Sequence, residues 1–515
     1  MKIVIVGGGP GGLYLSALLK RADPKREVVV LERNRADDPY GFGVVFSDNT
    51  LSSLAEGDPE LTAELGRLGP SWDAIQVQLH DRAMRCGGIG FTSISRARLL
   101  GMLQGQARDA GVDLRFETVL TDRDDVGDHD LLVAADGAKS TVRGWYGDAF
   151  GHHADIGDAK FIWMGTTKPF DCLTFLFEHD DHGAYGVHAY PFEDQTSTFL
   201  VETDPATWRA AGLDAFDPTQ AAPGESDRHS VDYLADLFAE HLDGHELLSS
   251  NSRWGNFPTV RNDRWSHGTT VLIGDAAHTA HFSVGSGTRM AMEDALALSQ
   301  ALDDASDIKT ALTDFETIRR PTVERIQAAA EPSLRWWERF GMYTDWSTER
   351  FAFHFLTRTP RITRGSLQRL DPSFIEQVDS AVPPVTSEGA SMDPASAPTP
   401  NSRRGATDPP ASRTNSLALT TNDEGFIDDD AAVAAAHDLV AEGATHITVL
   451  LGEKTPPEAA GRWRWRQLLV SERIRLELGI PTTVVLPDAD SDIADTVVQS
   501  GRADMVSKAY GMATL

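Results

Sequence analysis

Short apolar runs alternate with helical patterns at the start of the chain. Residues 2–6 (Lys-Ile-Val-Ile-Val) and 27–31 (Glu-Val-Val-Val-Leu) are continuous, β-branched and apolar, as expected of strands buried on both faces of a parallel sheet. Residues 13–21, between them, have helical periodicity. The pattern predicts a strand–helix–strand unit, and two further buried strands are predicted at 130–135 and 271–273.

The middle of the chain has a different pattern. Between residues 155 and 254 the apolar segments are short, rich in β-branched residues and aromatic, which favours an antiparallel sheet inserted into the α/β unit. These segments are residues 160–167, 173–177, 184–190 and 197–202. The pattern of residues 41–50 is too irregular to predict a helix or a strand. Either a loop that covers a ligand or a simple connecting loop fits them.

Residues 305–370 have helical patterns, and apolar periodicity then stops at residue 379. Pro, Ser, Thr, Ala and Gly dominate from there to residue 416, which predicts a disordered linker. The last hundred residues alternate helices and strands. The predicted fold is therefore α/β, in four parts. These are a Rossmann-like domain with a helical extension (1–154 and 255–378), an inserted β-sheet domain (155–254), the linker (379–416) and a small α/β segment (417–515).

The net charge, 47 − 77 = −30, narrows the classes of partner. A strongly acidic chain lacks the basic face that a nucleic-acid or anionic-membrane binder needs. The two cysteines, Cys86 and Cys172, exclude a disulfide framework and a Cys-rich metal site, so no metal is expected. The sequence shows no transmembrane span or signal-peptide core, which predicts a cytoplasmic protein.

The turn after the first strand has the spacing of a dinucleotide-binding site. Gly7-x-Gly9-x-x-Gly12 lies between a strand and a helix, and Glu32-Arg33 ends the next strand about 20 residues later. In this pattern Gly7 makes the tight turn, Gly9 lets the backbone approach a pyrophosphate, and Gly12 allows close packing. Glu32 would accept hydrogen bonds from ribose hydroxyls. A purely structural β-α-β unit is the alternative.

Two further strands end in an acid and a glycine. The first is followed by Asp136-Gly137 and the second by Gly274-Asp275. After the second, a loop leads into a helix whose N–H groups and dipole favour a ligand that becomes negative, such as a reduced flavin. Ser95, an N-cap residue, begins another helix with Arg96. The residues of the loop that leads into the helix are Gly285, Ser286, Gly287 and Thr288.

The three motifs, in this order and spacing, resemble the single-component (class A) flavoprotein aromatic hydroxylases over roughly residues 1–375. The resemblance implies that FAD is bound, with the Asp136-Gly137 motif near its pyrophosphate, Asp275 holding its ribityl chain and Arg96 lying along it. It also implies that the antiparallel sheet roofs the substrate pocket. Residues 40–48 and 256–288 further resemble the salicylyl-CoA 5-hydroxylase and 2-aminobenzoyl-CoA monooxygenase branch, which has Phe282 where most of the family has proline.

The implied activity is hydroxylation of an aromatic ring. NADH or NADPH, as a transient reductant, reduces FAD, and a flavin C4a-hydroperoxide formed with O2 transfers one oxygen to the ring. A salicylyl-CoA or related aminobenzoyl or hydroxybenzoyl thioester is the favoured substrate. A free or carrier-protein-tethered aromatic acid is an alternative, as is a flavin oxidase or dehydrogenase. A non-catalytic FAD-binding protein is a third kind of function.

An acceptor near a substrate hydroxyl would make the ring more nucleophilic. Three side chains are candidates for this role: His188 and Tyr190, which are two residues apart and so share a face, and His281. Alternatively, each of the three is a core or edge residue whose polar atoms are hydrogen-bonded within the protein. The residues expected to line the substrate pocket are Val45, Phe175, Phe177 and Phe282.

The basic residues between 350 and 369 suggest either a solvated face or a contact for CoA phosphates or an acidic carrier protein. The C-terminal segment, residues 417–515, resembles the final portion of Old Yellow Enzyme-type barrels. Leu486 stands where a phosphate-binding glycine is expected, so FMN is not expected to bind. We hypothesise a role in packing or in forming a homodimer.

Overall fold

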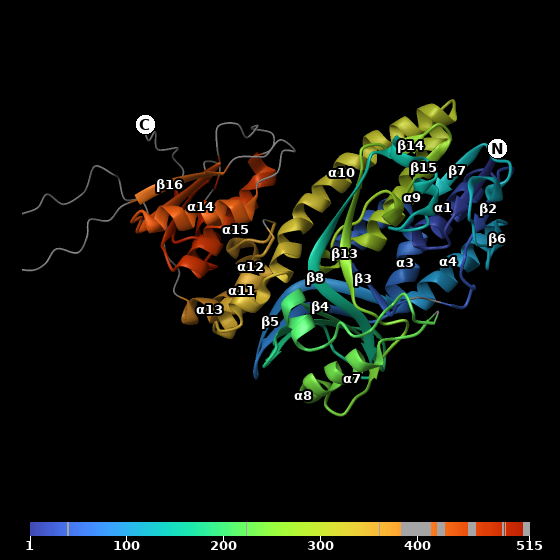
Figure 1. Ribbon diagram of the computed structural model, residues 1–515. Helices are drawn as coiled ribbons and strands as arrows, with labels where there is room; N and C mark the ends of the chain where they lie inside the picture. The colour runs from blue at the N-terminus through green and yellow to red at the C-terminus, as the bar shows by residue number, and fades with distance from the viewer. Residues whose placement is uncertain are drawn as a thin grey trace, which may run out of the picture. The chain divides into compact units, whose positions relative to one another are not determined.

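The computed structural model describes residues 1–38, 41–222, 224–359, 361–382, 414–419, 428–451, 460–486, 489 and 491–507 (Figure 1). The chain divides into two compact units, Met1–Thr344 and Asp345–Leu515.

The first unit is built on a six-stranded sheet in the order β14-β15-β7-β1-β2-β6, parallel except for β14. Helices α1 and α9 pack against each other where Gly11 meets Ala291. The bounds of these strands and of the main helices beside them are β1 Lys2–Val6, β2 Glu27–Leu31, β6 Asp113–Arg115, β7 Leu131–Ala134, β14 Ser266–His267, β15 Thr270–Leu272, α1 Pro10–Ala22, α4 Arg96–Ala110, α9 Gly287–Asp304 and α10 Ile308–Trp337. These confirm the predicted Rossmann-like strand–helix–strand unit and its additional buried strands.

The second sheet is antiparallel for most of its strand pairs and larger than residues 155–254. Its order is β12-β8-β11-β10-β9-β4-β5-β3, with β13 paired to β8. The predicted central strands are present, but strands from earlier and later in the chain join them. The bounds are β3 Gly43–Ser47, β4 Ser71–Leu79, β5 Arg82–Ser95, β8 His152–Thr166, β9 Leu173–Asp180, β10 Gly183–Glu193, β11 Thr196–Thr203, β12 Leu247–Leu248 and β13 Gly255–Asn262.

Residues 41–50, for which neither strand nor helix was predicted, contain both. Gly43–Ser47 forms β3, which pairs with β5, and helix α2 (Asp48–Gly57) follows immediately. The Ser47 side chain accepts a hydrogen bond from the Thr50 backbone N–H, which caps α2. The strand was not recognised because its partner lies some fifty residues further along the chain, so the local pattern alone did not indicate it.

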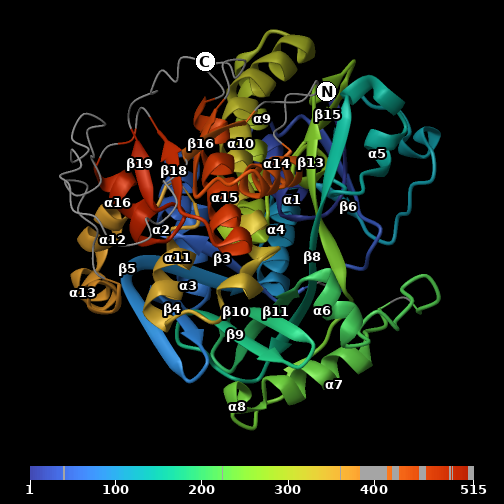
Figure 2. The ribbon, with the colours of Figure 1, turned by 60° about the vertical axis from the view of Figure 1, so that its left-hand side comes forward.

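The two faces of the antiparallel sheet have different neighbours. On the outer face, apolar side chains of β8–β11 pack with helices α7 (Arg228–Leu237) and α8 (Ala239–Leu242). These two helices are at the bottom of Figure 2, below strands β9–β11. On the inner face, Trp337 of α10 stacks on His188, with ring centroids 4.2 Å apart. Gly186 makes room for it, because a Cβ there would lie 2.6 Å from the Trp337 ring. The inner face is therefore covered by α10 and by the loop that precedes α9.

The second unit contains a four-stranded parallel sheet in the order β16-β17-β18-β19. Three helices between residues 348 and 381 belong to it, whereas the sequence placed them in the Rossmann-like domain. The last strand begins at residue 505, after a turn in which Gly501 has a positive φ of 84°. The bounds are β16 Thr414–Leu419, β17 His446–Leu451, β18 Thr482–Val485, β19 Met505–Ser507, α11 Thr348–Leu356, α12 Arg364–Leu370, α13 Pro372–Ala381, α14 Asp429–Ala441, α15 Ala460–Leu478 and α16 Ser491–Gln499.

Most of the linker predicted at residues 379–416 lies outside the described residues. In the described parts of the chain, no helix combines the length and apolarity needed to cross a bilayer.

Two of the basic residues near the start of the second unit interact with nearby side chains. Arg350 lies over the Trp346 ring at 3.8 Å, and Arg364 donates to Asp379 at 2.5 Å.

Candidate flavin and substrate site

The first glycine turn is shaped for close backbone contacts. Gly7 has a φ of 112°, and a Cβ there would lie 2.2 Å from the Ala135 carbonyl oxygen at the end of β7. A Cβ on Gly12 would lie 2.2 Å from the Gly7 carbonyl oxygen. At Gly9 no atom lies within 4 Å of the corresponding position. Two glycines are therefore required by the fold, and the third leaves open space beside the turn, as the spacing predicted.

Helix α1 presents its N-terminus at this turn. Its N-cap, Gly9, has no side-chain cap, and its first turn has no acidic residue, so the positive end of the dipole is not neutralised locally. The Glu32 carboxylate, next to the turn, accepts from the Gly8 N–H at 2.6 Å and from the Asn34 N–H at 2.8 Å. This fixes the carboxylate beside the turn. Arg33 is exposed.

The Asp136 motif lies against the same turn, because the Asp136 N–H is 2.9 Å from the Cβ position of Gly7. Its carboxylate accepts from the Ser140 hydroxyl and from the Thr141 N–H, at 2.6 and 2.7 Å. Gly137 has a φ of 87° with open space at its Cβ position. The motif is therefore a rigid, capped loop next to the glycine turn.

A buried arginine ties the second motif to the third. Arg143 donates to the carbonyl oxygens of Ala138 and Ala276, each at 2.7 Å. No role was predicted for Arg143 from the sequence, although it follows Asp136 by seven positions. Its position fixes the distance between the two loops.

The third motif is organised by Asp294, a fully buried residue of α9. Its carboxylate accepts from the Gly274 N–H at 2.9 Å and the Arg319 Nε at 2.9 Å, and is 2.7 Å from the His278 Nε2. Burial opposes ionisation, but His278, Arg319 and the Gly274 N–H together lower the pKa of Asp294. Asp294 therefore holds Gly274, which has a φ of 57°, and the loop that contains Asp275.

Asp275 itself is exposed, and Arg96, the first residue of α4, lies near enough for its charge to act on the Asp275 carboxyl. Desolvation by surrounding protein atoms raises the pKa of Asp275, while His278 and Arg96 oppose that shift. The predicted N-cap is confirmed, because the Ser95 hydroxyl accepts from the Arg98 N–H. The structure thus brings together Arg96 and Asp275, two residues that the resemblance places along a flavin.

The loop before α9 forms a second uncapped helix N-terminus. Gly285 has a φ of 61°, and Gly287 has open space at its Cβ position. No side chain caps α9, and the hydroxyl of Ser286, which is 6% exposed, has no hydrogen-bond partner among the described residues. Thr288 lies in the first turn of this helix. A buried hydroxyl normally has a partner, so the Ser286 hydroxyl is available to a bound group.

These features fit FAD. The Gly11–Ala291 contact brings α1 and α9 together near their N-termini, so two uncapped dipole ends lie in one region. One end suits the pyrophosphate, and the other suits the edge of the flavin ring that becomes negative on reduction. Open glycine positions and an unpaired buried hydroxyl line the same region. No group of His, Cys, Asp or Glu side chains among the described residues is arranged to hold a metal ion.

Replacing Ser286 by alanine tests the fit of this loop. We expect FAD affinity to fall by about three- to tenfold, since a hydrogen bond contributes roughly 0.5–1.5 kcal/mol. The unfolding free energy of the FAD-free protein should not fall, because the hydroxyl has no described partner to lose. Fluorescence titration of the apoprotein with FAD measures the first quantity and urea denaturation the second. Unchanged FAD affinity would show that Ser286 does not contact the cofactor.

Two of the three candidate proton acceptors, His188 and His281, contact the same buried carboxylate, that of Glu202. The His188 Nε2 is 2.7 Å from Oε1 of Glu202, and the His281 Nε2 is 3.4 Å from Oε2. All three side chains are at most 6% exposed. Burial opposes ionisation of the carboxyl, yet the two histidines lower the pKa of Glu202. The structure therefore joins His188, on the sheet, to His281, which directly precedes residues 282–287, the segment that leads into α9 and that we name the flavin loop.

Tyr190 occupies a different position. Its hydroxyl donates to the Gly43 carbonyl oxygen at 2.8 Å, and burial raises its pKa to about 12. Its ring stacks on Trp72, which in turn stacks on Phe91. Val45 packs with this group and lies 3.8 Å from the Cβ position of Gly285. Tyr190 is thus an apolar wall residue whose hydroxyl is already engaged, beside the flavin loop.

The other predicted pocket residues, Phe175, Phe177 and Phe282, differ in how deeply they are buried. Phe177 is fully buried against Trp337, and Phe175 is 3% exposed beside His188. Both belong to the packed core under α10 and do not form a free wall. Phe282 is half-buried, with its ring 4.2 Å from the His281 ring and 5.5 Å from the His188 ring. The assignment of Phe282 to the substrate pocket stays a prediction.

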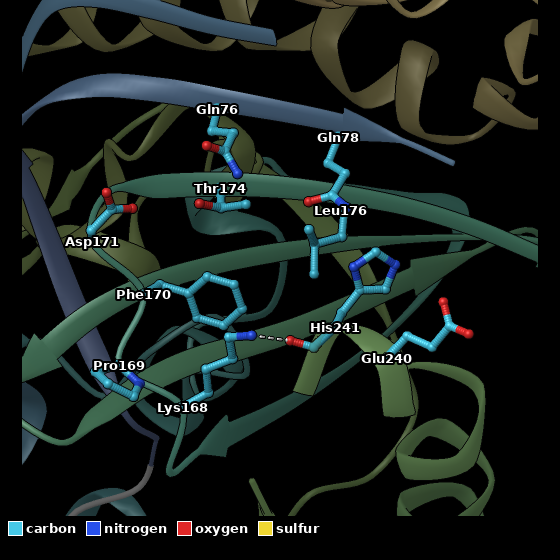
Figure 3. A pocket seen from close by; sticks show the side chains of 10 residues that line it. All are labelled: Gln76, Gln78, Lys168, Pro169, Phe170, Asp171, Thr174, Leu176, Glu240 and His241. Atoms are coloured by element: carbon cyan, nitrogen blue, oxygen red, sulfur yellow. Dashed lines mark hydrogen bonds between the residues drawn. The ribbon is translucent and has the colours of Figure 1, made fainter. Parts of the chain in front are cut away.

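A separate hollow lies on the outer face of the sheet (Figure 3). Thr174 and Leu176 of β9 line it, and these alternate with the inward-facing Phe175 and Phe177. Lys168 donates across it to the His241 carbonyl oxygen at 2.6 Å. The hollow therefore lies on the opposite face of the sheet from Phe175 and Phe177, two of the predicted pocket residues.

Two residues of the inner face were missed from the sequence. Glu202 is an acid inside an apolar strand, and alternation places it on the face opposite Phe199 and Val201. An acid at such a position was a signal available from the sequence. Trp72 lies in β4, a segment whose strand was not recognised. Its ring nitrogen is buried without a described partner.

Comparisons with known proteins agree with this geometry. The sequence profile described as the FAD binding domain matches residues 1–330. Salicyloyl-CoA 5-hydroxylase from Streptomyces sp is 44% identical over 98% of this chain and 99% of its own. The 3-hydroxy-4-methyl-anthranilyl-[aryl-carrier protein] 5-monooxygenase of Streptosporangium sibiricum is 36% identical over 70% of this chain and 95% of its own.

Among solved structures, the tetrameric form of 2-methyl-3-hydroxypyridine-5-carboxylic acid oxygenase has a TM-score of 0.53 at 21% identity, covering 70% of this chain and 97% of that one. It supports the fold. The proposed likeness of residues 417–515 to Old Yellow Enzyme-type barrels gains no support from these comparisons. The Streptomyces protein matches 98% of this chain, so it has a counterpart of most of the C-terminal unit.

Proposed function

Since this chain belongs to the FAD-binding-domain family and, within it, to the FAD-dependent aromatic hydroxylases, we propose that it hydroxylates the ring of an aromatic acid presented as a CoA thioester, with NADH or NADPH as reductant and O2 as oxidant. A salicyloyl or related hydroxybenzoyl or aminobenzoyl thioester is the proposed substrate. The observation that carries the proposal is the 44% identity along nearly the whole length of a salicyloyl-CoA hydroxylase.

When bound, FAD supplies the electron transfer and oxygen activation that no side chain can provide. The protein's contribution is to bind and orient it. The turn around Gly9 and the N-terminus of α1 suit the pyrophosphate, and Asp275 with Arg96 suits the chain between pyrophosphate and ring. The N-terminus of α9, with Ser286, suits the edge of the flavin ring.

The substrate ring is proposed to lie between the flavin loop and the inner face of the antiparallel sheet. Val45, Tyr190 and Phe282 supply apolar and aromatic surface there, and their packing excludes water from the reacting ring. His188 and His281 supply polar groups at the same boundary. This combination of apolar walls and a few placed polar groups is typical of sites for small aromatic ligands.

A carrier-protein thioester is the second candidate, because the Streptosporangium sibiricum relative acts on an aryl-carrier protein. That relative matches only 70% of this chain, whereas the CoA-acting relative matches 98%. The full-length match favours CoA. The part of this chain that the Streptosporangium sibiricum relative does not match is therefore the part to examine when CoA and carrier-protein substrates are compared.

The test is NADH and NADPH oxidation by the purified FAD-loaded protein, with mass analysis of the products. Salicylate, anthranilate and the CoA thioesters of both are offered separately. We expect only the thioesters to accelerate oxidation and to gain one oxygen atom. Hydroxylation of the free acids alone would refute the thioester assignment. Oxidation of NAD(P)H with no oxygenated product from any substrate would favour an oxidase.

A further inference from the structure

A hydrogen-bonded chain crosses the boundary between the sheet and the flavin loop. It runs from His188 through Glu202 to His281, and the His281 Nδ1 is 2.7 Å from the Ser283 hydroxyl. The Ser283 hydroxyl is in turn 2.7 Å from that of Ser333, on α10. The chain therefore links groups from the sheet, the loop before α9 and α10.

The surroundings of this chain are apolar. Phe175 and Trp337 pack on His188, and Phe257 and Phe282 pack on His281. The largest charges acting on Glu202 are the two histidines themselves. A buried carboxylate is costly unless it is paired and hydrogen-bonded. Glu202 is such a carboxylate, placed between two imidazoles that can gain or lose a proton, and this arrangement points to proton chemistry.

We infer that His188, Glu202 and His281 form one proton-accepting unit, in which an imidazole takes the proton of the substrate's ring hydroxyl and Glu202 is the positioning residue that stabilises the resulting imidazolium. The inference rests on the proposed function, since it needs a hydroxyaryl substrate beside Phe282. It assigns a role to a residue that touches neither ring nor flavin.

The proton balance is simple. The O–H bond of the ring hydroxyl breaks and an N–H bond forms on the imidazole, so a neutral phenol becomes a phenolate and the unit's charge changes from −1 to 0. The phenolate is the more electron-rich ring, which favours attack on an electrophilic oxygen. The proton returns to the oxygen of the hydroxylated product when that product leaves.

Glutamine at position 202 keeps the shape of the side chain but removes its charge. With salicyloyl-CoA, we expect Glu202→Gln to lower kcat by about 10²-fold, within the range of a general base, and to leave KM nearly unchanged. The acidic limb of the pH–rate profile should move to lower pH, because an imidazolium without the carboxylate loses its proton more readily. A purely structural role would not move that limb.

Glu178→Gln is the matched control. Glu178 also pairs with a histidine, His241, at 2.6 Å, but it belongs to β9 on the outer face of the same sheet. This variant should retain the wild-type kcat and pH profile. Comparable loss in both variants would show that any glutamate–histidine pair in this sheet matters only for stability.

A second readout does not depend on turnover. Binding of salicyloyl-CoA to the wild-type protein, without NAD(P)H, should produce the absorption of the ionised ring, and Glu202→Gln should not show it at the same pH. If the variant does not fold, the pH dependence of the rate is measured for the wild-type protein with ring-fluorinated thioesters whose hydroxyl groups are increasingly acidic. The rate should then depend less on pH as the hydroxyl becomes more acidic.

Failure of the inference and failure of the proposed function are distinguishable. If the wild type hydroxylates salicyloyl-CoA but never ionises it, or if Glu202→Gln keeps the wild-type rate and pH profile, the proton-accepting unit is refuted and the hydroxylase stands. If no thioester is hydroxylated, the proposed function fails, and the inference fails with it.

Discussion

Replacing Asp294 by alanine is expected to lower the free energy of unfolding by about 3–5 kcal/mol, the cost of breaking a buried ion pair by removing one partner. His278 and the Gly274 N–H would lose the carboxylate that they contact, and Arg319 would keep only its ion pair with Glu293. That is a large share of the roughly 5–15 kcal/mol that stabilises a typical domain. Urea denaturation of the FAD-free protein measures the change.

The control for Asp294 is Glu324→Ala, which removes an ion pair with Arg320 on the surface of α10. Exposed pairs of this kind contribute about 0–1 kcal/mol. Asp294→Ala should also lose FAD, because Gly274 and the loop that contains Asp275 would no longer be held. A loss below 1 kcal/mol for Asp294→Ala would show that this residue does not organise the loop.

The second large effect is expected at the glycine turn, where two substitutions to alanine should have different consequences. Gly12→Ala places a Cβ 2.2 Å from the Gly7 carbonyl oxygen, a backbone atom that cannot move away cheaply. We expect a loss of about 1–3 kcal/mol in the free energy of unfolding, as for other overpacked sites. The loss should be present without FAD, and urea denaturation measures it.

Gly9→Ala is the matched comparison, because its Cβ would meet no atom within 4 Å and its φ of −77° suits alanine. The FAD-free protein should keep its stability, while FAD affinity falls by roughly 10- to 100-fold, since about 1.4 kcal/mol corresponds to tenfold. Titration of the apoprotein measures that affinity. Wild-type FAD affinity in Gly9→Ala would mean that the cofactor does not pass over this turn.

The parts of the fold that depend on local pattern were predictable. The strand–Gly7 turn–helix unit was predicted from spacing and is confirmed, because a tight turn needs glycine at fixed positions whatever surrounds it. The N-cap at Ser95 was predicted for the same local reason. The FAD-binding family was likewise predicted, because three separated motifs in order carry more information than one.

The parts that depend on distant partners were not predictable from one sequence. Strand β3 exists because it pairs with β5, and Phe177 is core because Trp337 reaches over Gly186 to cover it. The link between His188 and His281 runs through Glu202 and spans 94 positions of sequence (188 to 281, inclusive). Alternation along a strand indicates which face a side chain occupies but not what lies opposite.

The proposed function requires that this protein transfer one oxygen atom from O2 to the ring of an aromatic CoA thioester. Its most direct test is turnover of salicyloyl-CoA with NADH or NADPH under ¹⁸O2, followed by mass spectrometry of the product. We expect one ¹⁸O atom on the ring and none on the thioester carbonyl. An unlabelled product, or NAD(P)H oxidation that leaves salicyloyl-CoA unchanged, would contradict the claim.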